Sequence, residues 1–236
     1  MQRRRFDFEP AYVLASRSYR ETSVLLEVFS SNHGRTGLVA RGARGPKSRL
    51  RGLLQPFTPL LLSWTETGEL GSLAAAEADG PAVALVGEAV FYGWYVNELL
   101  LKLLQRHDPH PALYLDYRAV LPPLATERAE PALRNFELRL LAELGYGLDL
   151  DQDFEPAAAY RYDFEAGPQK ALPGDLAAFG GASLIALRDN RLIGADAGVQ
   201  RDARRLMRAA LRRQLGGREL ETPRLLRALR ERGRPG

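Results

Sequence analysis

The chain has 236 residues, with 33 Lys or Arg, 29 Asp or Glu and a formal net charge of +4. It contains no cysteine, which excludes disulfides, thiolate zinc sites and cysteine nucleophiles. No apolar run approaches the roughly 18 residues of a membrane span, and no apolar core follows the first arginines as in a secretory signal. We therefore expect a cytoplasmic protein without a membrane partner.

The charges are unevenly distributed along the chain. Residues 1–58 carry 11 basic and 4 acidic side chains, residues 59–200 carry 10 and 21, and residues 201–236 carry 12 and 4. Two cationic ends flank an acidic middle, which indicates a polyanionic partner at the ends.

Short strands are predicted over residues 10–80 by apolar, β-rich runs between turn residues. They are Ala11–Ser16, Thr22–Phe29, Thr36–Ala40, Phe57–Trp64 and Leu70–Ala78. The polar segment Arg17–Arg20 indicates a hairpin with a longer loop, and Pro59 suggests an edge strand or a bulge. Five such strands suit a small closed barrel: a five-stranded OB-fold, or almost equally an SH3-like barrel.

A basic, glycine-rich segment lies between the third and fourth strands, flanked by two strand-like pieces, Leu38–Ala40 and Leu50–Leu54. From Arg35 to Arg51 the chain holds six cations and no carboxylate: Arg35, Arg41, Arg44, Lys47, Arg49 and Arg51. Glycine lets a backbone approach a polyanion closely, and guanidinium groups bind phosphate oxygens in pairs. On charge alone, a merely solvated basic loop explains the segment equally well.

The pattern changes to a helical period after Gly80-Pro81, which predicts an N-terminal domain over 1–80 and a helical domain over 81–236. The expected helices are Val83–Gln105, Ala112–Leu121, Pro131–Leu144, Val199–Leu215 and Arg224–Arg232. The first is apolar nearly all round, which favours burial inside a bundle. Thr222-Pro223 predicts a side-chain N-cap for the last helix. Residues 150–197 form the least regular part.

Catalytic constellations are poorly supported. Pro46 precedes Lys47, where a phosphate-binding P-loop needs glycine and its amide. The carboxylates between Asp149 and Glu155 alternate as in a calcium loop, but Phe154 and Tyr160 occupy the positions that require Gly and Glu. We expect no enzyme, no cofactor and no metal, although a metal-dependent nuclease built on Asp149–Glu155 stays an alternative.

A set of short motifs runs through the N-terminal third of the chain. They are Tyr12-Val13-Leu14, Tyr19-Arg20-Glu21-Thr22-Ser23, Phe29, Gly34-Arg35, Val39-Ala40-Arg41-Gly42-Ala43-Arg44, Lys47-Ser48, Leu54-Gln55-Pro56-Phe57, Glu69-Leu70 and Ala76-Glu77. With these motifs the chain resembles the RecO family of bacterial recombination mediators. The resemblance is dense over residues 11–78 and thins to a helical pattern afterwards.

The resemblance implies an α+β protein: an N-terminal five-stranded OB-fold β-barrel followed by an α-helical bundle domain. It implies DNA repair and recombination through the RecF pathway. Members bind single- and double-stranded DNA, anneal complementary strands, and act with RecR and often RecF. They load RecA onto DNA coated by single-stranded DNA-binding protein, whose C-terminal tail some members bind. The expected location is cytoplasmic and nucleoid-associated.

The chain departs from the many members that carry a four-cysteine zinc module. Leu184 and Leu187 occupy the C-x-x-C spacing after Gly180-Gly181. We therefore expect a degenerate, zinc-free lobe within residues 150–197, held by a small apolar packing unit. The C-terminal helices would follow over 199–232.

The residues predicted to bind DNA are the cations of the barrel and of the basic C-terminal helix. They are Arg35, Arg41, Arg44, Lys47, Arg49, Arg51, Arg17, Arg20, Arg204, Arg205, Arg208 and Arg212. Candidates for base stacking are Tyr12, Tyr19, Phe29, Phe57 and Trp64, with Phe29 and Trp64 favoured as core. Arg118, Arg134 and Arg139 are the candidates for the protein tail. An RNA-binding barrel protein of translation or ribosome assembly stays open as another alternative.

Overall fold

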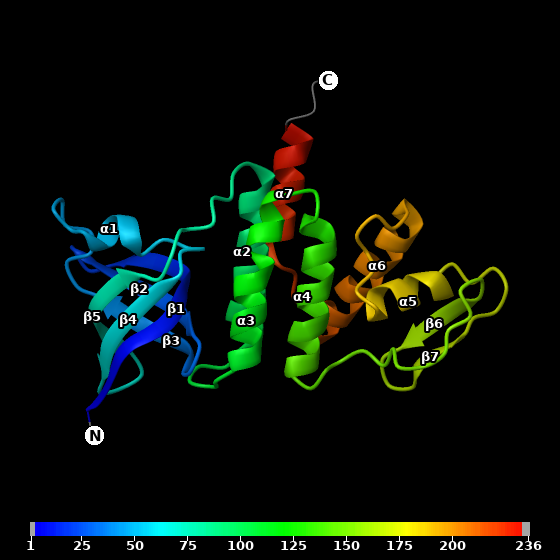
Figure 1. Cartoon of the computed structure of the whole chain (residues 1–236), viewed down its shortest axis with the longest axis horizontal. Coiled ribbons are helices and arrows are strands. Elements are labelled where there is room, and N and C mark those ends of the chain that lie inside the picture. Colours follow the sequence, from blue (N-terminus) through cyan, green and yellow to red (C-terminus); the bar gives the residue numbers. More distant parts are fainter. Residues whose placement is uncertain (1–2, 233–236) are drawn as a thin grey trace. The chain divides into compact units, whose positions relative to one another are not determined.

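The computed structural model describes residues 3–232 (Figure 1). Its first five strands are β1 (Arg4–Tyr19), β2 (Ser23–Ser30), β3 (Gly34–Ala40), β4 (Leu60–Glu66) and β5 (Gly71–Ala78). They close into a barrel in the order β1-β2-β3-β5-β4, in which only β3 and β5 run parallel. The short helix α1 (Leu50–Leu53) lies between β3 and β4 in the chain. The predicted α+β class and OB-like barrel are confirmed.

The barrel core comes from alternate positions along the strands, since successive side chains of a strand point to opposite faces. Leu26 and Val28 of β2 are fully buried, and so is Trp64 of β4. The Trp64 indole donates a hydrogen bond to Glu66 at 2.8 Å, and Phe6 stacks on its ring with 4.7 Å between centroids. The strands were predicted from the apolar, β-rich character of these segments, which the buried positions reflect.

Three local expectations for the barrel are wrong. Strand β1 continues through Arg17–Tyr19, which pair with β2, so the hairpin turns tightly over Arg20–Thr22. Pro59 directly precedes β4, which pairs with β1 on one side and β5 on the other, so it marks no edge strand. The Leu50–Leu54 piece contains a helical turn instead of a strand.

The described residues form two compact units. One contains the chain up to Ala125 and from Leu220 onward; the other is Thr126–Glu219. Outside the barrel segment, the helices of the first unit are α2 (Glu88–Leu103), α3 (Pro111–Val120), a 3₁₀ turn (Pro122–Ala125) and α7 (Glu221–Arg232). The barrel thus shares a unit with three helices, and the predicted division at residue 80 stays a prediction.

Helix α2 packs on the barrel through a buried polar contact. The Asn97 side chain donates to the backbone carbonyl of Leu14 at 2.8 Å and accepts from the Tyr117 hydroxyl of α3 at 2.7 Å. Burial raises the pKa of Tyr117 well above its usual value, so the hydroxyl keeps its proton. Trp94 of α2 is 44% exposed, so the expectation that this helix is buried all round is wrong.

Helix α7 lies beside α2, and α2 also caps its N-terminus (Figure 1). The Glu98 carboxylate accepts hydrogen bonds from the backbone N–H groups of Glu221 at 2.8 Å and Thr222 at 2.9 Å. Near the other end, Arg230 pairs with Glu88 at 2.6 Å. The predicted Thr222 cap is wrong, because Thr222 lies inside the helix, where it is buried.

The second unit combines three helices with a small sheet. Its helices are α4 (Ala129–Glu143), α5 (Gly181–Arg188) and α6 (Ala197–Gln214), and its strands are β6 (Ala159–Asp163), β7 (Gly167–Lys170) and β8 (Phe179–Gly180). The sheet order is β7-β6-β8. Helix α4 ends where Gly145 adopts a φ of +80°, as the capping glycine predicted.

The predicted lobe has an apolar core and more regular structure than expected. Leu184 and Leu187 of α5 are 1% and 2% exposed and share this core with Phe154, Tyr160 and Phe179. Apolar side chains thus fill the positions with zinc-ligand spacing. A β-carbon on Gly181 would lie 2.0 Å from the Glu155 carbonyl oxygen, so the backbone packs too closely there for any other residue.

Candidate nucleic-acid interface

The basic segment after β3, Arg41–Arg51, is called the cationic loop below. The N–H of Arg44 donates to the carbonyl of Thr22 at 2.9 Å, which ties the loop to the β1–β2 turn. Two tight turns follow, closed by Gly45 N–H to Gly42 at 3.0 Å and Ser48 N–H to Gly45 at 3.0 Å. Ala43 is buried in the barrel core and anchors the segment. The loop is therefore shaped by its backbone and one apolar anchor.

The side-chain charges of the cationic loop point into solvent. Its members Arg41, Arg44, Lys47, Arg49 and Arg51 are all exposed. None makes an ion pair with a carboxylate that the structure describes. Five cations held on one short segment without neutralising partners produce a positive local potential suited to a polyanion.

The end of β1 and the turn that follows it bring two more predicted cations to the same end of the barrel. Arg17 and Arg20 are exposed, and the Arg20 guanidinium lies over the Tyr19 ring at 5.2 Å. The turn lies beside the cationic loop because β2 begins opposite the end of β3, with Val24 paired to Ala40. These seven cations are called the cationic surface: Arg17, Arg20, Arg41, Arg44, Lys47, Arg49 and Arg51.

Arg35, the remaining barrel candidate, has another role. Its guanidinium donates to the Leu101 carbonyl at the end of α2 at 2.8 Å and lies 3.9 Å from the Glu27 carboxylate. Burial lowers the pKa of Arg35, against the neighbouring Glu27 charge. Because Arg35 holds the barrel to α2, we leave it out of the proposed interface.

Most of the aromatic candidates lie in the core. Tyr12, Phe29, Phe57 and Trp64 are each at most 7% exposed, which confirms the core assignment of Phe29 and Trp64 and removes Tyr12 and Phe57 as stacking candidates. Of the five candidates, only Tyr19 is partly open to solvent.

The four arginines of α6 that were predicted to bind DNA divide into two pairs. Arg204 pairs with Glu130 at 3.2 Å, and Arg205 bonds to the carbonyls of Leu176 and Ala178 and lies 4.2 Å from the centre of the Phe179 ring. Arg208 and Arg212 are exposed and have no ion pair among the described carboxylates. Only the second pair has the free charge that a phosphate contact requires.

The three arginines predicted for the protein tail fall in different environments. Arg118 is exposed on α3 in the first unit, whereas Arg139 is exposed on α4 in the second. Arg134 is buried and pairs with the fully buried Glu137 at 2.8 Å. Its burial therefore makes Arg134 inaccessible to a partner's tail.

The carboxylates of the acidic middle do not gather into a metal site. Among residues 3–232, no group of three or more His, Asp or Glu side chains could hold a metal ion. Nor does any described helix combine the length and apolar character needed to cross a membrane. The structure thus offers no ligand set to the nuclease alternative.

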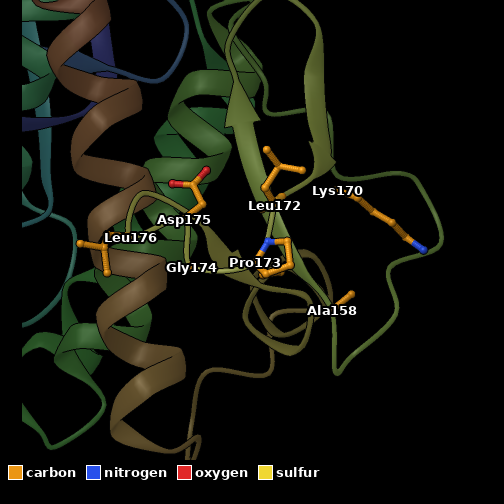
Figure 2. Close-up of a pocket in the computed structure, with 9 residues that line it drawn as sticks. Ala158, Lys170, Leu172, Pro173, Gly174, Asp175 and Leu176 are labelled. Carbon is orange, nitrogen blue, oxygen red and sulfur yellow. The ribbon is translucent and has the colours of Figure 1, made fainter.

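A surface hollow of about 420 Å³ lies in the second unit (Figure 2). Leu172 and Leu176 border it and are 80% and 94% exposed. Its two charged lining residues have partners: Lys170 pairs with Glu155 at 2.6 Å and Asp175 with Arg161 at 3.3 Å. Both charged side chains that line the hollow are therefore already in ion pairs.

A five-stranded OB-fold followed by helices defines the class of this protein. Comparison with known families matches residues 8–81 to the N-terminal and residues 86–223 to the C-terminal model of recombination protein O. The chain belongs to the RecO family of DNA repair proteins.

Relatives named DNA repair protein RecO match over nearly their whole length. The Methylococcus capsulatus protein is 46% identical over 92% of this chain and 92% of its own. The Halorhodospira halophila protein is 44% identical over 94% and 97%. The Yersinia enterocolitica protein is 41% identical over 93% and 94%.

Proposed function

We propose that the protein binds single- and double-stranded DNA and anneals complementary strands. It acts as a mediator that helps to load RecA onto DNA coated by single-stranded DNA-binding protein. The observation that carries the proposal is the set of exposed, unpaired cations on the cationic loop. Membership of a DNA repair family supports DNA as the polyanion, ahead of RNA.

The cationic surface would bind phosphates without reading sequence. Arginine and lysine contacts to the backbone displace condensed counterions and carry no information about bases. Two strands held on one positive surface repel each other less, which favours pairing. Arg208 and Arg212, on α6 of the second unit, would make phosphate contacts of their own.

The salt dependence of binding tests the loop assignment. Each cation that no longer meets a phosphate should flatten the slope of log affinity against log salt by about 0.9 on duplex or 0.7 on single strands. Substituting Arg41, Arg44 and Lys47 by Ala should therefore flatten the slope by about two to three. The matched control is Lys102, Arg128 and Arg191 to Ala, which removes the same charge elsewhere. Equal slopes for both triple variants would contradict the assignment.

Annealing of complementary strands coated with single-stranded DNA-binding protein tests the activity itself. The wild type and the control triple variant should accelerate annealing, whereas the loop variant should not. Comparing affinity for RNA and single-stranded DNA of equal length tests the alternative. A clear preference for RNA would favour the translation or ribosome-assembly role.

The proposed partners besides DNA are RecR, the acidic tail of single-stranded DNA-binding protein, and indirectly RecA and RecF. For the tail, burial leaves Arg118 and Arg139 as the accessible candidates. Each would attract a tail carboxylate. Arg139→Ala should weaken binding of a tail peptide, with Arg191→Ala as the control. Unchanged binding would exclude Arg139.

A further inference from the structure

Phe8 is an exposed aromatic residue in an unusual backbone conformation. It lies in a β-bulge of β1, where the pairing with β4 shifts between Phe6 and Glu9. Its φ is +53°, and its side chain is 56% exposed. The Phe8 N–H donates to the Ser63 hydroxyl at 3.0 Å, which holds the bulge in place.

The bulge sends two neighbouring aromatics in opposite directions. Phe6 faces inward and stacks on Trp64, whereas Phe8 lies on the outside of the barrel. A bulky residue with positive φ is an outlier, since glycine adopts this conformation without strain. Bulges re-aim side chains, and retained strain is a reason to look for function at that position.

The charges around Phe8 favour a polyanion. Arg3, Arg4 and Arg5 precede it, and Arg5 pairs with Asp7 at 2.9 Å. The Glu9 carboxylate accepts a hydrogen bond from the Asn32 side chain at 2.8 Å and lies 3.2 Å from the His33 imidazole nitrogen. The nearby carboxylates therefore have partners, while Arg3 and Arg4 form no ion pair with any described carboxylate.

We propose that Phe8 is a stacking platform for an unpaired nucleobase and forms a second contact point for single-stranded DNA. Barrels that bind single strands combine cations with exposed aromatic faces. Phe8 and Arg17 lie nine positions apart along β1, which is at most about 30 Å at the rise of a strand. A paired base offers no free face, so Phe8 distinguishes single strands from duplex, which the cationic surface does not. This inference rests on the proposed DNA binding.

Binding by the full chain tests the proposal with three probes of equal phosphate number. They are oligothymidylate of about 16 nucleotides, the matching abasic oligomer, and a duplex. Phe8→Ala should weaken oligothymidylate binding by about 5- to 150-fold, as expected when one stacking aromatic is removed. Binding of the abasic oligomer and the duplex should not change. Tyr146→Ala is the matched control, because Tyr146 is 54% exposed in the second unit.

Two further substitutions separate stacking from structural support. Phe8→Trp should keep the affinity, and its added fluorescence should be quenched by oligothymidylate but not by the abasic oligomer. Phe8→Gly should raise the melting temperature, because glycine relieves the strained φ, and yet weaken oligothymidylate binding as much as Ala does.

Two results would overturn the proposal. One is an affinity of Phe8→Ala for oligothymidylate that equals that of the wild type. The other is an equal loss for all three probes, which would assign Phe8 to support of the barrel. If the loop variant loses affinity while Phe8→Ala does not, only the stacking site fails. If the wild-type protein binds none of the probes, the proposed DNA binding fails with it.

Discussion

Arg134 and Glu137 form an ion pair one turn apart on α4, with 10% and 0% of their side chains exposed. Removing one member of a buried pair takes away a charge that offsets the cost of burying the other. Arg134→Ala should therefore lower the free energy of unfolding by about 3–5 kcal/mol, measured by urea denaturation.

Two variants control this prediction. Arg139→Ala, on the exposed side of the same helix, should stay within about 0.5 kcal/mol of wild type. Replacing both members of the pair, Arg134→Met with Glu137→Leu, should recover most of the stability, since apolar residues of similar volume often substitute well for a buried pair. If Arg134→Ala alone lowers the free energy of unfolding by less than about 1 kcal/mol, another group offsets the charge of Glu137.

For single residues, composition predicts the charge of a segment but not the partner of each side chain. Arg35 and Arg41 lie six residues apart in the same basic stretch, yet one bonds to the end of α2 and the other faces solvent. The difference depends on Leu101, which is 66 residues away in the chain. Phe8 escaped the prediction because the first strand was expected to begin at Ala11, whereas β1 begins at Arg4 and contains a bulge at Phe8.

Elements with a strong period were predictable, and their ends were not. The five strands and the main helices follow apolar patterns that local sequence carries. The start of α7 instead depends on Glu98, whose carboxylate is 123 residues from Glu221. The Thr-Pro signal is a sound local rule that this long-range contact overrides.

The Glu98 cap gives a prediction for one element. Glu98→Ala leaves two backbone N–H groups of α7 without acceptors and should destabilise the helix by about 0.5–2 kcal/mol. Trypsin should then cleave faster after Arg224 and Arg227, as followed by mass spectrometry. Glu98→Gln keeps one acceptor oxygen, so its cleavage rate should lie between those of the wild type and Glu98→Ala. Glu127→Ala, at an exposed carboxylate, is the control; equal cleavage rates in all variants would exclude a capping role.

Family membership and the outline of the whole molecule follow from the N-terminal third of the sequence, where the diagnostic residues are dense. The unit to which the C-terminal residues belong does not follow from the sequence. Helix α7 joins the unit that contains the barrel, although the preceding 94 residues belong to the other unit. Contacts between distant segments decide such an assignment, and no local pattern encodes them.

Truncation after Glu219 tests this allocation. Both tryptophans, Trp64 and Trp94, lie in the first unit, so tryptophan fluorescence reports on that unit. Removal of α7 should lower the free energy of unfolding of the first unit, measured from its urea transition, by about 2 kcal/mol or more. The capped helix end and the partly buried Leu226 are lost with the helix. Hydrogen exchange in peptides from 126–219 should stay as in the full chain. Faster exchange there instead would assign α7 to the second unit.

The return of α7 to α2 also sets an order of events during synthesis. Ribosomes add about 5–20 residues per second, so the 94 residues between the two parts of the first unit take roughly 5–20 s to make. Throughout that interval Glu88 and Glu98 of α2 lack their partners on α7. We expect chaperones that recognise apolar helices to engage α2 until the last helix arrives.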